Sequence, residues 1–338
     1  MPRASNIPRG PAASPAERGE AVGDGPGARA APRGEAVGDG LAARLAGAPI
    51  SWGVCEVPGW GRQLDPERVL SEMAGLGLRA TELGPTGYLP TEPGALLATL
   101  ERHGLRLVAG FVPLVLHAPD AHADLAAADQ TARTLAAAGA DVFLAALVAD
   151  HGWSRPRPLD DAAWNRLTAR LQSLEQITAG HGLTLAVHPH WDTQIETASD
   201  VARLLETTTT ALCLDTGHLA LGGQDPAALV ATHGDRIAHV HLKDVDERVA
   251  VRLRRRVLTL VQATQAGLFR PLGEGDVRID TVLRRLDRQG YADWLVLEQD
   301  TAITGEEPPV GSGPVVDVAR SIDFVNMLAL DEEEETVA

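Results

Sequence analysis

The sequence predicts a (β/α)8 barrel, and three observations support this fold class. From about residue 48, short apolar runs alternate with longer stretches whose apolar residues recur at helical spacing. Eight runs occur in about 290 residues, each followed by a helical stretch, which is the count and length of this barrel. The runs are continuously apolar, as expected for parallel strands that are buried on both faces.

The apolar runs define the expected strands in chain order. They span 48–53, 78–83, 105–112, 142–147, 183–188, 211–214, 237–242 and 294–297. The expected helices lie between and after them, at 65–76, 92–103, 121–138, 160–179, 198–205, 226–233, 278–289 and 315–328. A doubly wound sheet is the alternative fold, but residues 52–56 lack the glycine-rich phosphate turn expected after its first strand.

Glycines mark the ends of several expected helices. In the first helix, apolar side chains recur on one face at Val69, Leu70, Met73 and Leu76, and Gly77 follows directly. Glycine also stands between helix and strand at Gly104, Gly139, Gly182 and Gly290. Glycine is the common residue after a helix because it adopts the left-handed conformation easily. The spacing of these glycines therefore supports repeated helix-to-strand connections.

The two ends of the chain differ from the expected barrel of residues 47–330. Residues 1–46 are rich in Ala, Gly and Pro, and residues 18–25 recur letter for letter as residues 33–40. Such a segment buries too little apolar area to offset its ordering entropy, so we expect a disordered extension. It lacks the apolar stretch of a secretory signal, and its acids argue against an organellar one. Residues 331–338 form an acidic tail.

Composition narrows the classes of function. The chain has 30 Lys and Arg against 46 Asp and Glu, a net charge of −16, which disfavours nucleic acid as a partner. No apolar run reaches the roughly 18 residues of a membrane helix, so no membrane contact is expected. Two cysteines build no disulfide framework, which fits a cytoplasmic protein. We expect a small-molecule substrate, and a homo-oligomer is compatible with such a barrel.

Possible metal ligands follow four consecutive strands, at the ends where barrel sites lie. These residues are His188, Asp215, His241 and Glu298. Adjacent strands lie about 4.8 Å apart, so the four side chains can converge on one ion. His190 and His239 stand two residues from a ligand and face the same side. Two imidazoles and two carboxylates suit Mn²⁺ or Co²⁺, with Zn²⁺ or Fe²⁺ as alternatives.

Several stretches resemble one known family. The segments 215–218 (Asp-Thr-Gly-His) and 239–244 (His-Val-His-Leu-Lys-Asp), with Glu298, resemble the xylose isomerase-like barrels. This family includes sugar-phosphate isomerases and epimerases, endonuclease IV and inosose dehydratase. Residues 48–53, 82–84, 188–190, 193–197 and 273–276 are most similar to the inosose dehydratase branch. The resemblance runs from about residue 47 to residue 330.

The resemblance implies roles for individual residues. Asp215, His241 and Glu298 fall on metal ligands of the family, and His218 falls on a histidine that contacts the substrate or supports the ligands. The family's strand-5 glutamate falls on His188. The chain therefore has only one of the two glutamates that epimerases of this family place on opposite faces of the substrate.

The expected activity is that of a metal-dependent carbon–oxygen lyase in carbohydrate metabolism, specifically inositol catabolism. It would dehydrate a keto-polyol of the inosose type through an enediolate, with the metal acting as a Lewis acid. Glu298 or a nearby histidine would remove the proton, and His218 or His190 would protonate the departing hydroxyl. An isomerase or epimerase of sugars or sugar phosphates on the same site is the alternative. A non-catalytic sugar- or metal-binding barrel is a third possibility.

Four further residues are candidates for substrate contact, namely Trp52, Glu82, Lys243 and Glu274. Trp52 is either a wall of the sugar pocket or a core residue, and Glu82 is either a substrate ligand or part of an ion pair. Lys243 would bind a substrate oxygen or phosphate, and Glu274 lies in a loop flanked by glycines. The basic run 252–256 is either a solvated helix face or a site for a phosphate or a partner.

Overall fold

A computed structural model describes the backbone of residues 40–337 and the side chains of residues 40–330. Residues 1–39 of the predicted extension, and residue 338, lie outside the described residues. Within residues 40–46, a short 3-10 helix, Ala42–Arg44, leads into a strand that begins at Leu45. The barrel therefore begins two residues before the predicted boundary. The backbone of 331–337, in the predicted acidic tail, continues the last helix.

Eight parallel strands form a closed barrel, which confirms the predicted fold. In chain order they are β1 (Leu45–Gly47), β2 (Ala80–Glu82), β3 (Arg106–Leu114), β4 (Val142–Leu147), β5 (Thr184–Val187), β6 (Ala211–Asp215), β7 (Ile237–Leu242) and β10 (Leu295–Leu297). Closure occurs because β1 pairs with both β2 and β10. No edge of this sheet is left open for pairing with another chain.

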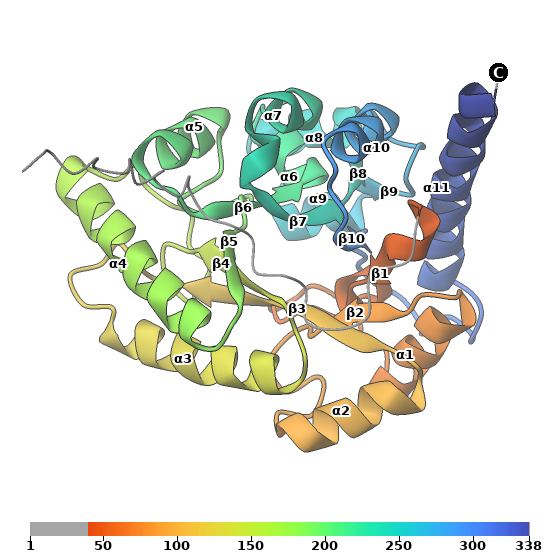
Figure 1. Ribbon diagram of the computed structural model, residues 1–338, viewed down its shortest axis with the longest axis horizontal. Helices are drawn as coiled ribbons and strands as arrows, with labels where there is room; N and C mark the ends of the chain where they lie inside the picture. The colour runs from red at the N-terminus through yellow and green to blue at the C-terminus, as the bar shows by residue number, and fades with distance from the viewer. Residues whose placement is uncertain (1–39, 338) are drawn as a thin grey trace, which may run out of the picture.

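Helices surround the barrel on the outside (Figure 1). They are α1 (Pro66–Gly75), α2 (Pro93–Arg102), α3 (His122–Ala137), α4 (Asp161–Gly180), α5 (Ala198–Thr207), α7 (Pro226–His233), α10 (Ile279–Arg288) and α11 (Pro314–Val337). Their apolar faces cover the strands, as Val69, Leu70 and Met73 of α1 show by being fully buried. The five glycines predicted to end helices have φ between 66° and 83°, the left-handed conformation that glycine adopts readily.

The prediction for the first strand was wrong. Residues 48–53 were expected to form it, but β1 ends at Gly47 and Pro49–Trp52 form a 3-10 helix. Pro49 has no N–H for a strand ladder, and the N–H groups of Ser51 and Gly53 close tight turns onto Ala48 and Ile50. The Ser51 hydroxyl then donates to the carbonyl of Leu297, which ties this turn to β10.

The connection between β7 and α10 contains elements that the apolar pattern did not predict. It holds β8 (Asp244–Val245), α8 (Glu247–Arg254), α9 (Leu260–Gln265) and β9 (Phe269–Arg270), and β8 pairs with β9 in a small antiparallel sheet. A short helix, α6 (Thr216–Leu221), follows β6. The predicted basic helix is α8, and its run continues beyond the helix to Arg256. We call residues 244–277 the β7–α10 excursion.

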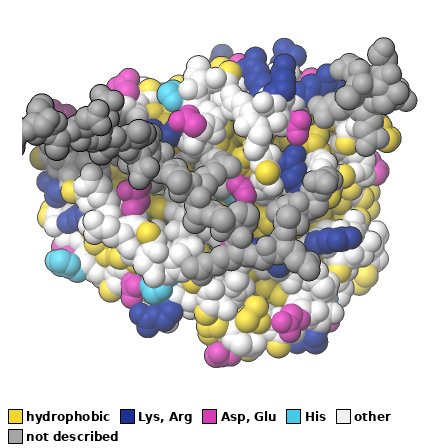
Figure 2. Space-filling model, in the orientation of Figure 1, with side chains coloured by type: hydrophobic (Ala, Val, Ile, Leu, Met, Phe, Trp, Pro, Cys, Tyr) yellow, Lys and Arg dark blue, Asp and Glu magenta, His cyan; other side chains and the backbone are white. Residues whose placement is uncertain are grey.

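The surface of the described residues carries mixed charge. Outside the grey atoms of Figure 2, basic, acidic and apolar side chains lie interspersed on the face shown. None of the helices in residues 40–337 is long and apolar enough to span a membrane.

The capping box of α5 provides a test of the fold. Thr197 Oγ1 accepts from the N–H of Asp200, and Asp200 Oδ2 accepts from the N–H of Thr197. We expect Thr197→Ala to lower the free energy of unfolding by about 1 kcal/mol, because the N–H of Asp200 loses its acceptor. Urea denaturation measures this change. The control is Thr99→Ala in the interior of α2, where the exposed hydroxyl only returns to the carbonyl of Ala95. Equal losses in the two variants would contradict the capping argument.

Candidate active site

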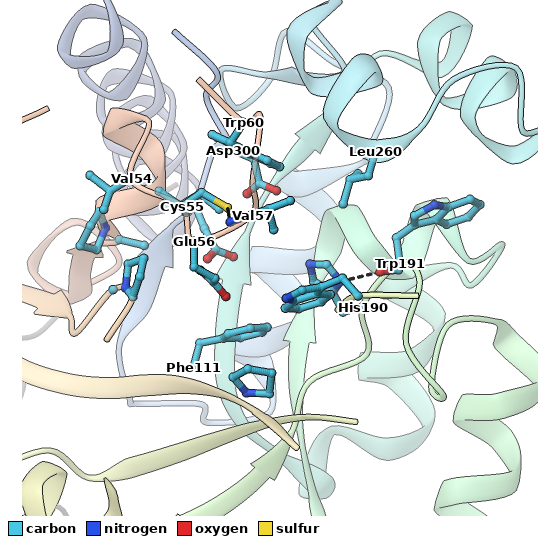
Figure 3. A pocket seen from close by; sticks show the side chains of 18 of the residues that line it. Val54, Cys55, Glu56, Val57, Trp60, Phe111, His190, Trp191, Leu260 and Asp300 are labelled. Carbon is cyan, nitrogen blue, oxygen red and sulfur yellow. Dashed lines mark hydrogen bonds between the residues drawn. The ribbon is translucent and has the colours of Figure 1, made fainter. Parts of the chain in front are cut away.

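A cavity of about 460 Å³ lies over the carboxyl ends of the strands. Its polar lining includes residues of the predicted site, among them His188, His190, Lys243 and Glu298. Aromatic and aliphatic side chains line much of the rest, including Trp153. Trp60, Phe111, Trp191 and Leu260, which also line the cavity, are labelled in Figure 3. A polar cluster within apolar walls is typical of a small-molecule site.

The four predicted metal ligands converge. One donor atom from each of His188, Asp215, His241 and Glu298 lies within 4.8 Å of the other three. His188 Nε2 is 3.3 Å from Asp215 Oδ2 and 3.1 Å from His241 Nδ1, and Glu298 Oε2 is 2.6 Å from His241 Nδ1. Strand register causes this, because Asp215 pairs directly with His241 on the neighbouring strand.

The donor set fits a divalent cation. Asp215 Oδ2 and Glu298 Oε2 are buried, and their contacts with His241 and Lys243 are ion-pair contacts that lack hydrogen-bond geometry. Buried carboxylate oxygens need hydrogen-bond partners, or a metal ion. Two imidazole nitrogens and two carboxylate oxygens are suitable ligands for first-row divalent metals. The geometry thus supports a metal centre at the floor of the cavity.

Glu82 orients one of these ligands from behind. Its Oε1 lies 2.8 Å from His241 Nε2 and 2.7 Å from His239 Nε2. An imidazole that donates Nε2–H to a carboxylate presents Nδ1 to a metal, which is the common arrangement around such ligands. Burial alone would raise the pKa of Glu82, but His241 and His239 lower it below its usual range. Glu82 also lines the cavity, so its predicted contact with substrate stays a prediction.

Asp215 is oriented by the helix that follows it. It is the N-cap residue of α6, and its Oδ1 accepts from the N–H of His218 at 2.7 Å. The other oxygen, Oδ2, therefore points to the cluster. Although burial raises the pKa of this carboxyl group, the Lys243 charge brings it well below its usual range. Asp215 is thus anionic, as its predicted role requires.

Lys243 lies among three carboxylates at the cavity floor. Its Nζ is 2.7 Å from Asp300 Oδ1, 3.0 Å from Glu298 Oε2 and 3.3 Å from Asp215 Oδ2. Burial opposes the charge, but the three carboxylates raise the pKa of Lys243 well above its usual value. Gly217 leaves room for the lysine stem, since a Cβ there would lie 2.7 Å from its Cγ. Burial raises the pKa of Asp300 to about 7.

The backbone of Trp191 assigns opposite tautomers to two histidines. His190 Nδ1 lies 2.6 Å from the Trp191 carbonyl oxygen, so it carries the proton and leaves Nε2 as an acceptor (dashed line in Figure 3). The Trp191 N–H donates to His218 Nδ1 at 3.2 Å, so the proton of His218 is on Nε2. The two rings are in contact, with centroids 3.7 Å apart and an interplanar angle of 39°. Burial lowers the pKa of His190 to about 3 and that of His218 well below its usual value, so both rings are neutral.

Two predicted substrate contacts lie away from the cavity. Trp52 is a core residue, fully buried, and its indole N–H donates to Glu72 Oε2 at 2.8 Å. Glu274 lies on the surface and pairs with Arg320, whose Nε is 2.8 Å from its Oε1. The glycines beside Glu274 bind Asp244 instead, because the N–H groups of Gly273 and Gly275 both donate hydrogen bonds to Asp244 Oδ2.

Sequence reasoning missed several lining residues. Asp300 stands two residues after Glu298, so period-two spacing could have placed it beside the site. Phe111 lies within a predicted strand, but nothing in the sequence distinguishes it from a core residue. Trp60, Trp153 and Trp191 lie on loops, whose course the apolar pattern does not predict.

Comparisons with known proteins agree with this geometry. A family model described as "xylose isomerase-like TIM barrel" matches residues 70–321. The chain is 34% identical to the rhizopine catabolism protein MocC of Rhizobium meliloti, over 75% of this chain and 80% of that protein. It is 33% identical to the inosose dehydratase of Geobacillus kaustophilus, over 76% of this chain and 87% of that protein.

Solved structures show the same fold at lower identity. An L-ribulose 3-epimerase covers 87% of this chain and 98% of its own, with a TM-score of 0.64 and 18% identity. A zinc-bound IOLI protein covers 85% of this chain and 98% of its own, with a TM-score of 0.62 and 14% identity. These similarities support the barrel itself.

The contact between Glu82 and His241 predicts an effect on metal affinity. We expect Glu82→Gln to weaken Mn²⁺ or Co²⁺ binding by about 10- to 100-fold, because an amide supports the imidazole less well than a carboxylate. Calorimetric titration of metal-free protein measures this loss. The control is Glu56→Gln, since Glu56 also lines the cavity but is not a member of the ligand clusters. Unchanged affinity in Glu82→Gln would rule out this role.

Proposed function

Because the chain belongs to the xylose isomerase-like TIM barrel family, we propose that it is a metal-dependent dehydratase of a keto-polyol of the inosose type. The convergence of His188, Asp215, His241 and Glu298 on one point carries this proposal. The chain is an enzyme of the lyase or isomerase type, as predicted, since relatives at one-third identity include an inosose dehydratase. Dehydration, the metal and the substrate are the proposed parts.

The four converging side chains would hold the cation. When bound, a divalent metal supplies Lewis-acid polarisation of a substrate ketone. The zinc in the IOLI structure is a precedent for metal binding on this fold. Mn²⁺ and Co²⁺ suit the mixed nitrogen and oxygen donors here, with Zn²⁺ and Fe²⁺ as alternatives.

His190 is the residue we assign to proton removal. Its Nε2 is an acceptor, and the ring lines the cavity beside His188. Glu298 is less available, because its Oε2 is 2.6 Å from His241 and 3.0 Å from Lys243. Loss of the proton from the carbon next to the ketone leaves an enediolate, which then expels the hydroxyl one carbon further on.

His218 is the residue we assign to hydrogen-bonding the departing hydroxyl, while the proton that His190 has taken passes to that hydroxyl, so that water leaves and both rings end neutral. The Nε2–H of His218 is buried and has no hydrogen-bond partner among the described residues. The two adjacent histidines therefore offer an acceptor on His190 and a donor on His218, both in neutral rings. Lys243 lies at the same floor and would hold a substrate oxygen with its ammonium group.

The aromatic walls suit the carbon face of a ring polyol. Phe111 and Trp153 lie parallel, with centroids 6.2 Å apart and an interplanar angle of 6°. Both line the cavity together with the catalytic floor. Axial C–H groups of a cyclic polyol can pack against such rings while its hydroxyls face the polar floor.

The first test is metal-dependent turnover of 2-keto-myo-inositol. We expect anaerobic, metal-loaded protein to generate the ultraviolet absorbance of an enolised diketone, and chelated protein to generate none. Asp215→Asn and Glu298→Gln should abolish the signal, whereas Glu274→Gln on the surface should retain it. Conversion of ketoses without water loss would favour the isomerase alternative. Bound metal and polyol without turnover would favour a binding protein.

The second test concerns His190. We expect His190→Gln to lower kcat by about 100- to 10,000-fold, the usual contribution of a positioned base. Metal affinity should stay unchanged, because His190 is not among the converging ligands. Steady-state kinetics and metal titration measure the two quantities. His181→Gln is the control, because that histidine pairs with Asp129 on the helical layer. A kcat within a few fold of the parent would show that another group removes the proton.

A further inference from the structure

We propose that Arg256 is a positioning residue, which holds the loop that assigns the tautomers of His190 and His218. The inference rests on the proposed roles of those two histidines. Arg256 belongs to the β7–α10 excursion and follows α8, whereas the histidines follow β5 and β6. Its action on them is therefore indirect and passes through Trp191.

The guanidinium of Arg256 contacts the β5–α5 loop in three ways. Its Nη1 donates to Asp192 Oδ1 at 2.6 Å, and its Nη2 donates to Glu196 Oε1 at 2.9 Å. Its Cζ lies 4.2 Å from the centroid of the Trp191 ring. Planar stacking combined with two directed N–H groups is the particular capacity of arginine. We call this set of contacts the Arg256 latch.

Glu196 extends the latch into the loop backbone. While its Oε1 binds Arg256, its Oε2 accepts from the N–H of Asp192 at 3.0 Å. The loop is further closed by the N–H of His190, which donates to the carbonyl of Ile195 at 3.0 Å. Trp191 thus lies between a fixed turn and the guanidinium, and its carbonyl and N–H are the groups that bind His190 and His218.

Backbone conformation supports a specific role for this arginine. In the described residues, three non-glycine residues have positive φ, and two of them are the ion-paired Asp192 (φ 61°) and Arg256 (φ 56°). The left-handed conformation after a helix is normally taken by glycine, because a Cβ makes it unfavourable. An arginine there is explained by its side chain, which is half-buried against Trp191. Two unfavourable conformations at one contact suggest a functional constraint rather than ordinary surface packing.

The same excursion also holds the opposite wall of the cavity. Gln265 at the end of α9 donates to the carbonyls of Gly59 and Trp60, and Thr259, Leu260 and Val261 line the cavity. The excursion therefore extends across one side of the cavity, from the loop after β1 to the loop after β5. The Arg256 latch attaches the β7–α10 excursion to the β5–α5 loop, which carries His190.

The solvated-face interpretation of the basic run applies to Arg252 and Arg255, whereas Arg254 pairs with Glu247. Arg252 and Arg255 are exposed, whereas Arg256 has all of the contacts described above. Arg255→Ala is therefore a matched control, because it removes the same side chain one position away. Arg256→Lys keeps the charge and one ion pair but loses the stacked, forked contact.

The first measurement is histidine NMR, which needs neither substrate nor metal. Long-range ¹H–¹⁵N spectra distinguish the Nδ1–H and Nε2–H tautomers, and His190→Gln and His218→Gln assign the two signals among 11 histidines. We expect one fixed tautomer for each ring in the parent protein and in Arg255→Ala. Arg256→Ala should give mixed tautomers for both rings. Unchanged spectra in Arg256→Ala would overturn the proposal.

The second measurement separates positioning from general stability. Misplacement of reacting groups can lower a rate by about 100-fold, so Arg256→Ala should lower kcat by up to that factor with little change in KM. Metal affinity should be unchanged, because the ligands follow the strands rather than the loop. Arg256→Lys should recover part of kcat, and it serves as the main variant if Arg256→Ala does not fold. A raised KM with unchanged kcat would contradict the proposal. If Arg256→Ala gives mixed tautomers but the parent protein never converts the keto-polyol, the Arg256 latch is supported and the dehydratase function is rejected.

Discussion

The register of the parallel strands is the constraint on which the site depends. β6 and β7 pair so that Asp215 lies opposite His241, and β10 pairs His241 with Val296, two residues before Glu298. Barrel closure fixes these offsets, because each strand has a neighbour on both sides. A shift of one residue would turn a ligand from the barrel interior toward the helices. The ligand cluster is therefore a consequence of backbone pairing in the strands that carry Asp215 and His241 and directly precede His188 and Glu298.

The burial of charge is the second constraint. Asp215, His241 and Lys243 are almost completely inaccessible to solvent, so none of them could stay charged without a partner. Each partner also restricts the chemistry. Lys243 engages Glu298 on one side, and Glu82 holds His241 on the other, which leaves the neutral histidines as the mobile-proton groups. Electrostatics thus separates the residues that would bind a cation from those that would move a proton.

The parts of the molecule that follow from repeating patterns could be predicted from the sequence. Strand count, the glycine stops and the four ligands all depend on local composition and on the rule that barrel sites lie at strand ends. Trp52 and Glu274 show the limit of that reasoning, because an aromatic or acidic residue near a strand end looks the same whether it faces the cavity or not. The turn at Pro49 also interrupts an apolar run that resembled a strand, since proline removes a donor from the ladder.

The tautomer pair depends on information that no local pattern carries. The backbone of one residue, Trp191, is hydrogen-bonded to both His190 and His218. Arg256, 65 positions further along the chain, packs on the Trp191 ring. Such a relationship requires the excursion after β7 to contact the loop after β5, as Arg256 does. Loops tolerate sequence change more readily than strands do. In the proposed function, metal binding would depend on residues at strand ends, and proton transfer would depend on the loop that holds the two histidines. The two properties would therefore vary separately, and one ligand set would serve either water loss or isomerisation according to how the loops place these histidines.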